Sequence, residues 1–195
     1  MSVMERHAIF PLNIFLLPGE VTHLHIFEPR YKQLLTDVEE EGIPFGIYYQ
    51  GTENKLNLGT MVELIQVINK YSGGEMDISV RATRIFKLEW FFDKLNEKLY
   101  PGGEVEWNPV EDRAISNEVL NEYKDLISLK HPDEIMEFPN MIFELGPLLN
   151  LQSKEKLALV QMSDISQDKL LLSHIRLQTA ILKQDQNGQF NYNLN

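Results

Sequence analysis

The sequence predicts an α+β fold in which a small, bent β-barrel subdomain with one inserted helix, residues 1–112, is followed by a helical bundle, residues 113–195. Three observations predict it. Strand-like alternation dominates up to about Asp112, helical periodicity dominates after it, and one helical segment interrupts the strands at residues 29–41. A chain of 195 residues with 43% hydrophobic content is long enough to bury such a core.

The first strand is predicted within residues 9–19, where Pro11 and Pro18 bracket an apolar run. Since proline has no N–H, this strand can be paired on one side at most near its ends, as at an edge or rim. Pro18 and Gly19 make a turn, and a second extended run follows at residues 21–27. An unpaired rim strand near Phe15 could also bind a peptide by strand addition.

The inserted helix is predicted to begin at Pro29 and to stop at Gly42. Four residues at helical spacing form its apolar face: Tyr31, Leu34, Leu35 and Val38. We expect the Glu28 carboxylate to accept backbone N–H groups as an N-cap and Arg30 to pair with a carboxylate on the barrel. Both residues are therefore given structural roles.

The clearest strand is residues 76–90, which alternate apolar and polar side chains almost without a break. Another extended segment, residues 61–71, precedes it, and residues 72–74 form a hairpin turn. Fifteen residues at ~3.3 Å each would span ~50 Å, so the ribbon must bend. Arg84 is the one charged residue on its apolar face. It either extends to the barrel rim or anchors a ligand carboxylate.

Later segments are shorter. Residues 99–107, interrupted by Pro101, form a loop and a short closing strand. Helices are predicted at residues 117–129, 141–149, 153–162 and 166–183, with Ser153 and Ser166 as caps of the last two. The polar segment 184–195 is expected to be loose.

Composition narrows the class of protein. The chain has no cysteine, which excludes disulfides and thiol catalysis. It has neither an export signal nor an apolar stretch near ~18 residues, so a cytoplasmic protein without a membrane segment is expected. The net charge of −11 disfavours nucleic acid, which proteins usually hold with a basic face.

Catalytic motifs are not found. Residues 46–52 have the glycine spacing of a phosphate loop but lack its lysine, and no serine has the glycines of a nucleophile elbow. Ser153 and Lys154 are neighbours at a helix start, where capping explains the serine. His23, His25 and Glu28 could be zinc ligands on paper, although a hydrogen-bonded His25 needs no metal. We therefore predict no enzyme, cofactor or metal site.

The run in residues 9–19 (IFPLNIFLLPG), followed by residues 24–31 (LHIFEPRY), resembles the opening of the substrate-binding N-terminal domain of Lon proteases. Further matches follow at residues 45–47, 59–60, 74–78 and 105–106. The resemblance implies a barrel of the PUA-like type and a stand-alone member without the ATPase and protease domains. It also implies structural roles for the residues of the second run: His25, Phe27, Glu28, Pro29, Arg30 and Tyr31.

The function that this resemblance implies is a non-catalytic module that recognises unfolded or exposed apolar polypeptide segments, or that acts as an adaptor for a protein partner such as a separate protease or ATPase. Candidate peptide contacts are large side chains expected at loops and rims: Phe15, Leu17, Tyr48, Tyr49 and Arg84. Two alternatives stay open. One is a PUA-like protein that binds RNA or a small molecule, and the other is a metal-dependent hydrolase built on His23, His25 and Glu28.

Overall fold

The computed structural model describes residues 5–107, 109–132 and 136–192, with side chains described to residue 184. The chain divides into two compact units. The first unit consists of Met1–Glu111 with Leu151–Ala158, and the second of Asp112–Asn150 with Leu159–Asn195. Residues 151–158 thus belong to the first unit, although the sequence reading grouped them with the helices.

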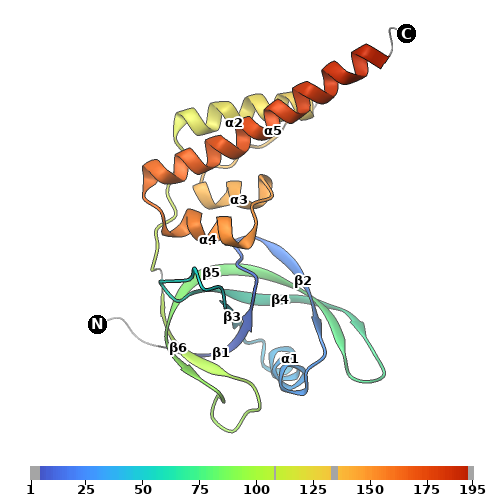
Figure 1. Ribbon diagram of the computed structural model, residues 1–195. Helices are drawn as coiled ribbons and strands as arrows, with labels where there is room; N and C mark the ends of the chain where they lie inside the picture. Colours follow the sequence, from blue (N-terminus) through green and yellow to red (C-terminus); the bar gives the residue numbers. More distant parts are fainter. Residues whose placement is uncertain (1–4, 108, 133–135, 193–195) are drawn as a thin grey trace. The chain divides into compact units, whose positions relative to one another are not determined.

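The first unit is a six-stranded mixed sheet with one inserted helix (Figure 1). Its elements are β1 (Glu5–Leu12), β2 (Val21–Ile26), α1 (Pro29–Glu41), β3 (Phe45–Tyr49), β4 (Leu58–Lys70), β5 (Met76–Phe92) and β6 (Gly102–Trp107). The strand order is β2-β5-β4-β3-β1-β6, and β5 also pairs with β6. Five strands therefore close on themselves, while β2 extends the sheet beside the first half of β5. This confirms the predicted near-barrel with an inserted helix.

Pro11 in β1 is paired with a neighbouring strand on one side only, as the sequence predicts. The N-terminal half of β1 pairs with β6, and its C-terminal half, including Pro11, pairs in parallel with β3. No β6 partner is needed at Pro11, so its missing N–H interrupts no ladder. The observed strand ends at Leu12, so most of the apolar run between Pro11 and Pro18, residues 13–17, lies outside the sheet.

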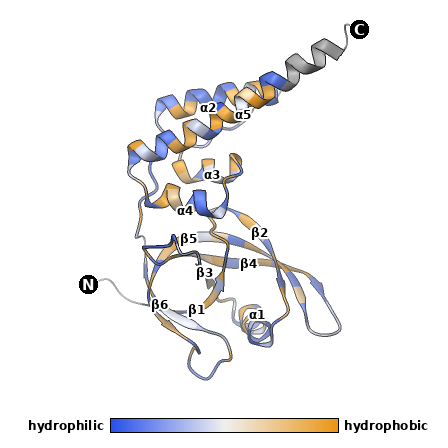
Figure 2. Cartoon of the chain, in the orientation of Figure 1, coloured by the Kyte–Doolittle hydropathy of each residue, from blue (hydrophilic) through white to orange (hydrophobic). Residues whose placement is uncertain are grey.

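Four bulges bend the long strands. Ile65 and Ile68 on β4 and Thr83 and Glu89 on β5 are skipped by the register of the facing strand. A bulge adds one residue to one strand, increases its local twist and reverses the facing of the side chains beyond it. The predicted bend is therefore divided among several positions. Figure 2 shows the hydrophobic and hydrophilic residues interleaved along these strands.

Two apolar clusters lie on opposite faces of the sheet, since neighbouring strand residues such as Ile9 and Phe10 belong to different clusters. The larger cluster includes the apolar face of α1, and the ring of Tyr31 stacks on that of Phe10 with centroids 3.9 Å apart. The smaller cluster consists of Ile9, Met61, Phe86, Leu88 and Val105.

Glycines make room for the smaller cluster. A Cβ added to Gly46 would lie 2.8 Å from the Phe86 ring, and one added to Gly59 would lie 2.4 Å from that ring and 2.6 Å from the Ile47 carbonyl oxygen. Gly103 is equally close to Leu88, at 2.4 Å. Real Cβ atoms do not approach this closely, so β3, β4 and β6 can pack against the side chains of Phe86 and Leu88 because they carry glycine at these positions.

The second unit is helical. Its elements are α2 (Asn117–Lys130), the 3-10 turn η1 (Ile142–Glu144), α3 (Leu145–Leu148) and α5 (Asp164–Tyr192), while α4 (Ser153–Gln161) crosses the boundary between the units. Ser116 caps α2 by accepting the Val119 N–H at 3.4 Å. The helix α5 starts before Ser166 and continues to Tyr192, so the prediction of a loose segment is wrong for residues 184–192, and residues 193–195 lie outside the described residues. Elongating a helix that has already formed adds one hydrogen bond per residue, which outweighs the polar composition.

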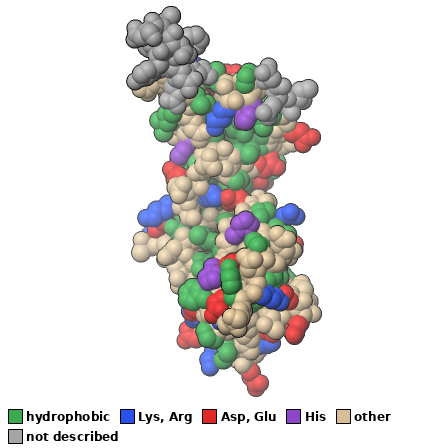
Figure 3. Space-filling view, turned by 90° about the vertical axis from the view of Figure 1, so that its right-hand side faces the viewer, with side chains coloured by type: hydrophobic (Ala, Val, Ile, Leu, Met, Phe, Trp, Pro, Cys, Tyr) green, Lys and Arg blue, Asp and Glu red, His purple; other side chains and the backbone are tan. Residues whose placement is uncertain are grey.

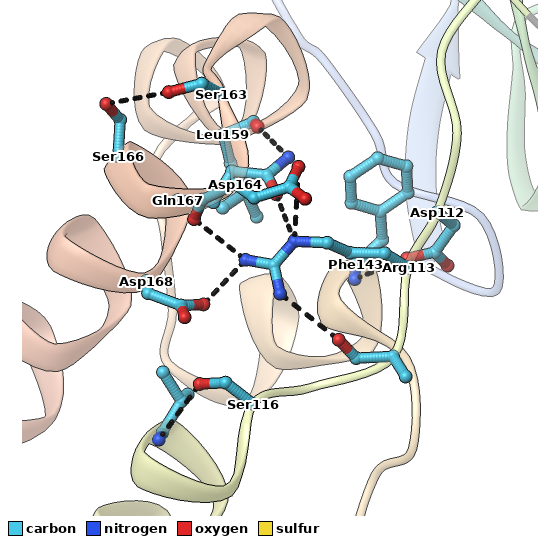
Figure 4. A network of polar contacts seen from close by, with 12 residues as sticks. Asp112, Arg113, Ser116, Phe143, Leu159, Ser163, Asp164, Ser166, Gln167 and Asp168 are labelled. Atoms are coloured by element: carbon cyan, nitrogen blue, oxygen red, sulfur yellow. Dashed lines mark hydrogen bonds and ion pairs between the residues drawn. The ribbon is translucent and has the colours of Figure 1, made fainter.

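Arg113 joins the segment before α2 to the start of α5 (Figure 4). Its guanidinium donates to Gln167 Oε1 at 2.8 Å, to Asp168 Oδ1 at 2.6 Å and to the carbonyl of Asp164 at 2.9 Å. Gln167 in turn donates to the carbonyl of Leu159 at 2.9 Å. Arg113 therefore contacts the start of α5 directly and is connected to α4 through Gln167.

Candidate polypeptide-binding surface

The segment between β1 and β2, which carries two of the predicted peptide contacts, is packed into the first unit. Phe15 is 1% exposed and Leu17 is 0% exposed. The Phe15 N–H donates to Ser153 Oγ at 3.1 Å, and the Leu17 N–H donates to Glu20 Oε2 at 2.5 Å. These side chains are held in the core and offer no surface to a peptide in this conformation.

The same contacts explain Ser153. It is the first residue of α4, and its hydroxyl accepts from the Phe15 backbone N–H. Lys156, one turn later, pairs with Glu20. Both side chains of this pair are largely buried. The start of α4 thus binds the segment 13–20 through one hydrogen bond and one ion pair. No local pattern in the sequence predicts these long-range contacts.

The two adjacent tyrosines of β3 have different surroundings. Tyr49 is buried, and its hydroxyl donates to Glu53 Oε1 at 2.7 Å. Burial and this hydrogen bond to Glu53 raise the pKa of Tyr49 to about 12. Tyr48 is half-buried against the smaller cluster, and its hydroxyl lies 3.4 Å from Asn57 Oδ1. Only Tyr48 has a ring edge available to a ligand.

Arg84 is exposed and lies beside the smaller cluster, at its rim. Its guanidinium carbon lies 3.6 Å from the centroid of the Trp107 ring, which packs against that cluster. A cation over an indole face is a favourable arrangement that covers apolar surface. The contact accounts for a charged residue in an apolar pattern, and the guanidinium edge still faces solvent.

The residues of the family motif are mostly engaged with one another or with neighbouring strands. His25 Nδ1 lies 2.7 Å from Asp77 Oδ1 on β5, and hydrogen bonds from Tyr71, His25 and Asn69 lower the pKa of Asp77 to about 2. His25 is hydrogen-bonded, as expected, and its side chain is exposed together with that of Asp77. Phe27, which carries no hydrogen-bonding group, is 60% exposed.

Two details of the predicted helix start are wrong. Glu28 occupies the N-cap position of α1, but its side chain makes no cap hydrogen bond. Its carboxylate accepts from Arg30 Nε at 2.9 Å, so Arg30 pairs with its neighbour two residues away and not with the barrel. Pro29 removes one of the N–H groups that a cap would satisfy, and a nearby guanidinium is the stronger partner.

An exposed apolar surface lies on the first unit, and none of its residues is among the peptide contacts that the sequence predicts. Large side chains from β2, from the turn after it and from the β4–β5 hairpin are between two-fifths and three-fifths exposed: Val21, Phe27, Ile65, Ile68 and Tyr71. We call this set the outer apolar surface. Figure 3 shows histidine and hydrophobic side chains next to one another over this part of the molecule.

A pattern in the sequence could have revealed part of this surface. Residues 64–65 and 67–68 are adjacent apolar pairs inside a strand, where alternation allows only one of each pair to face the core. The bulges at Ile65 and Ile68 expose the second member of each pair. Breaks in alternation therefore mark exposed isoleucines on β4.

Neither a metal site nor a membrane span is found among the described residues. In the described ranges no group of three or more histidine, aspartate or glutamate side chains is placed to hold a metal ion. Within the same part of the chain, none of the helices combines the length and the apolar character needed to span a bilayer.

Comparison with known proteins gives the family. The model of the ATP-dependent protease La (LON) substrate-binding domain matches residues 7–175. The crystal structure of a Lon N-terminal domain protein from Xanthomonas campestris is 25% identical and has a TM-score of 0.62, covering 82% of this chain and 92% of that one. The N-terminal domain of the Mycobacterium avium complex Lon protease is 13% identical and has a TM-score of 0.50, covering 92% and 98% of the two chains.

A search of the curated proteins finds no match. The family match nevertheless extends over both units of the chain and includes every strand after the first two residues of β1. It also agrees with the closed sheet, the inserted helix and the helices that follow. This chain belongs to the Lon substrate-binding domain family.

Proposed function

We propose that this protein binds unfolded or extended polypeptide segments through apolar groups on its first unit and performs no chemistry of its own. The observation that carries the proposal is membership of a family whose model describes a substrate-binding domain. The outer apolar surface supports it: its side chains are exposed, and the His25 ring lies 6.0 Å from the Phe27 ring and 6.1 Å from the Tyr71 ring. Exposed apolar side chains that lie together commonly mark interaction sites. A separate protease or ATPase would then use the bound segment.

The candidate contacts are reduced to those with free surface. Phe15, Leu17 and Tyr49 are left out because their side chains are buried. Tyr48 and Arg84 remain as proposed contacts at the rim of the smaller cluster. The outer apolar surface adds Phe27 and Ile68 as contacts that a peptide can reach without any rearrangement.

The test is direct binding to a permanently unfolded polypeptide. A reduced and alkylated secretory protein, labelled with a fluorophore, should bind the wild-type chain, whereas the same protein with its disulfides intact should not. Replacing Phe27 and Ile68 together by serine should weaken binding roughly tenfold, because two exposed apolar contacts are lost. The measurement is fluorescence anisotropy against protein concentration.

Matched variants separate the possible surfaces. Ile165 in the second unit is 71% exposed, and Ile165→Ser is the control for the loss of an apolar group. Tyr48→Ala tests the rim contact without the core damage that Tyr49→Ala would cause. Absence of binding by the folded wild-type protein would remove the proposed function, whatever the variants do.

A further inference from the structure

The second half of β4 has one edge that no strand covers. β5 pairs with β4 from Leu58 to Lys70, whereas β3 pairs only with Gly59–Val62. Among the residues that the structure describes, no strand and no isolated bridge pairs with that edge beyond Val62. Residues 63–70 therefore present backbone N–H and C=O groups sideways, as a template for another strand.

The chain itself keeps this edge open. β3 begins at Phe45, which pairs with Val62, and the residue before it is Pro44. Proline has no N–H to donate, and Gly42, with φ of 66°, directs the preceding chain back into α1. β3 therefore does not continue along β4 beyond Val62, and the edge of β4 at residues 63–70 stays without a neighbouring strand.

A groove lies at this edge. It has a volume of about 650 Å³ and is lined by the end of α1, the connection to β3 and the uncovered part of β4: Val38, Glu39, Gly42, Ile43, Pro44, Glu63, Leu64, Gln66 and Val67. Ile43, Leu64 and Val67 are partly buried against the larger cluster and provide apolar contact. The groove therefore combines unpaired backbone with apolar side chains.

The charge of the groove is acidic. Glu39 and Glu63 are the charged residues of its lining. Lys70 Nζ lies 3.0 Å from Glu39 Oε1, which partly balances one of them at the hairpin end. The whole chain has a net charge of −11, so the surrounding field has the same sign. A basic segment is favoured there over an acidic one.

We propose that this groove receives an extended polypeptide segment as an added strand in line with β3, and that the segment alternates apolar residues with lysine or arginine. Backbone hydrogen bonds to residues 63–70 would bind it with little dependence on sequence. Alternate side chains of a strand point to opposite faces, so one set contacts Leu64 and Val67. The other set lies near Glu63. The inference rests on the proposed function and adds a second place on the first unit where a polypeptide segment can bind.

The first experiment measures backbone protection. A peptide of about nine residues that alternates valine and lysine should slow amide hydrogen exchange in residues 63–70. The slowing should be confined to the amides that face the uncovered edge, about half of them, because alternate residues of a strand direct their N–H groups to opposite sides. Exchange in β2, the other edge strand of the sheet, should stay unchanged.

The second experiment tests strand pairing chemically. N-methylation of alternate residues removes the donors along one edge of the peptide and leaves the opposite edge intact. One methylated set should weaken binding by roughly tenfold or more, since several hydrogen bonds are lost, whereas the complementary set should bind like the parent peptide. A peptide bound only through its side chains would not distinguish the two sets.

The third experiment uses charge. Glu63→Lys should weaken binding of the valine–lysine peptide roughly fivefold and improve binding of a valine–glutamate peptide. Glu97→Lys is the matched control, because Glu97 is an exposed residue of the β5–β6 loop that does not line the groove. It makes the same change in net charge and should leave both affinities nearly unchanged.

The outcomes are separable. If the unfolded polypeptide binds but protection appears at Val21, Phe27 and Tyr71 and not on the amides of residues 63–70, the strand-addition site is wrong and the proposed function stands. If residues 63–70 become protected without peptide as protein concentration rises, the occupant is a second copy of this chain, which also overturns the proposal. If nothing binds, both proposals fail together.

Discussion

Asp37 is a buried carboxylate on the side of α1 that faces the β5–β6 loop. It accepts hydrogen bonds from Lys98 Nζ at 2.8 Å and from the Tyr100 hydroxyl at 2.7 Å. Burial alone would raise its pKa, but the hydrogen bonds from Lys98 and Tyr100 outweigh burial and hold the pKa below its ordinary value. The ionised form therefore connects α1 to that loop.

We expect Asp37→Asn to destabilise the folded protein by about 1–3 kcal/mol near neutral pH. A carboxylate whose pKa is lowered by folding contributes stability above its ordinary pKa of 3.8, and this contribution is lost as pH falls through the lower folded value. The difference between variant and wild type should thus narrow below about pH 4. Urea unfolding at several pH values measures it.

Asp93→Asn is the control, because Asp93 is exposed in the same loop. It should change stability little at any pH. A constant difference between Asp37→Asn and wild type from neutral to acid pH would show that the charge of Asp37 contributes nothing.

For single residues, the sequence predicts where helices and strands begin better than it predicts which groups a side chain or backbone N–H will bind. The helix start at Pro29 is correct, but the Glu28 carboxylate binds Arg30 instead of the helix N-terminus. Phe15 was expected at a rim and lies in the core, because Ser153 takes its N–H. In both cases a hydrogen-bonding group binds a partner other than the one that the local sequence indicates. The partner of the Phe15 N–H is 138 positions away, so it leaves no local pattern in the sequence.

Among the elements, the start of α5 depends on one side chain. Arg113 is 20% exposed at its side chain and contacts Gln167, Asp168 and the carbonyl of Asp164. Arg176, farther along α5, is 55% exposed and pairs with Glu118 and Glu122 on α2. The two arginines form similar ion pairs at very different exposure, which makes them a matched pair.

Arg113→Ala should therefore destabilise the second unit by about 1–3 kcal/mol, because partly buried acceptors lose their donor. Arg176→Ala should cost below about 1 kcal/mol, as exposed ion pairs do. Both tryptophans, Trp90 and Trp107, lie in the first unit, so their fluorescence follows that unit during unfolding. Circular dichroism follows the helices.

The Arg113→Ala transition should move more by circular dichroism than by tryptophan fluorescence. Equal shifts for both arginine variants would mean that burial of Arg113 makes no difference. Equal shifts by both probes would mean that the two units unfold as one.

The strands show why elements are easier to predict than their registers. Alternation along residues 76–90 correctly predicted the long strand β5, which runs to Phe92. Alternation does not reveal which residue will bulge, because a bulge depends on the length and facing of the neighbouring strand. Thr83 is such a residue. The adjacent apolar pairs on β4 are the exception, because two neighbouring apolar residues cannot both face the core of a regular strand and so indicate a bulge.

For the whole molecule, charge is the property that composition predicts most directly. The net charge of −11 should favour basic unfolded polypeptides over acidic ones. Succinylation, which converts the lysines of the unfolded probe into carboxylates, should weaken its binding, and added salt should weaken binding of the unmodified probe. Anisotropy titrations at low and high salt measure both effects.

Binding that is indifferent to both treatments would mean that apolar contact alone selects the segment. A peptide acetylated at its lysines, which loses positive charge without gaining negative charge, separates loss of attraction from repulsion. It should bind with intermediate affinity.

The fold class and the family could be predicted from the sequence, because they depend on periodicity and on a dense local motif. The binding surface could not. The outer apolar surface combines residues from β2, the segment after it and the β4–β5 hairpin, and the groove combines α1 with β4. Such surfaces can be recognised only once the order of the strands in the sheet is known.

The close approach of the glycines to Phe86 also has an evolutionary consequence. The three atoms nearest to a methyl group at Gly46 belong to the side chains of Phe86 and Ile9, so alanine could be accepted at position 46 in a relative with a smaller residue at 86 and a shifted or smaller side chain at 9. A methyl group at Gly59 would meet the backbone oxygen of Ile47, which no substitution removes. Positions 46 and 86 should therefore covary among relatives, while position 59 should remain glycine regardless of its neighbours.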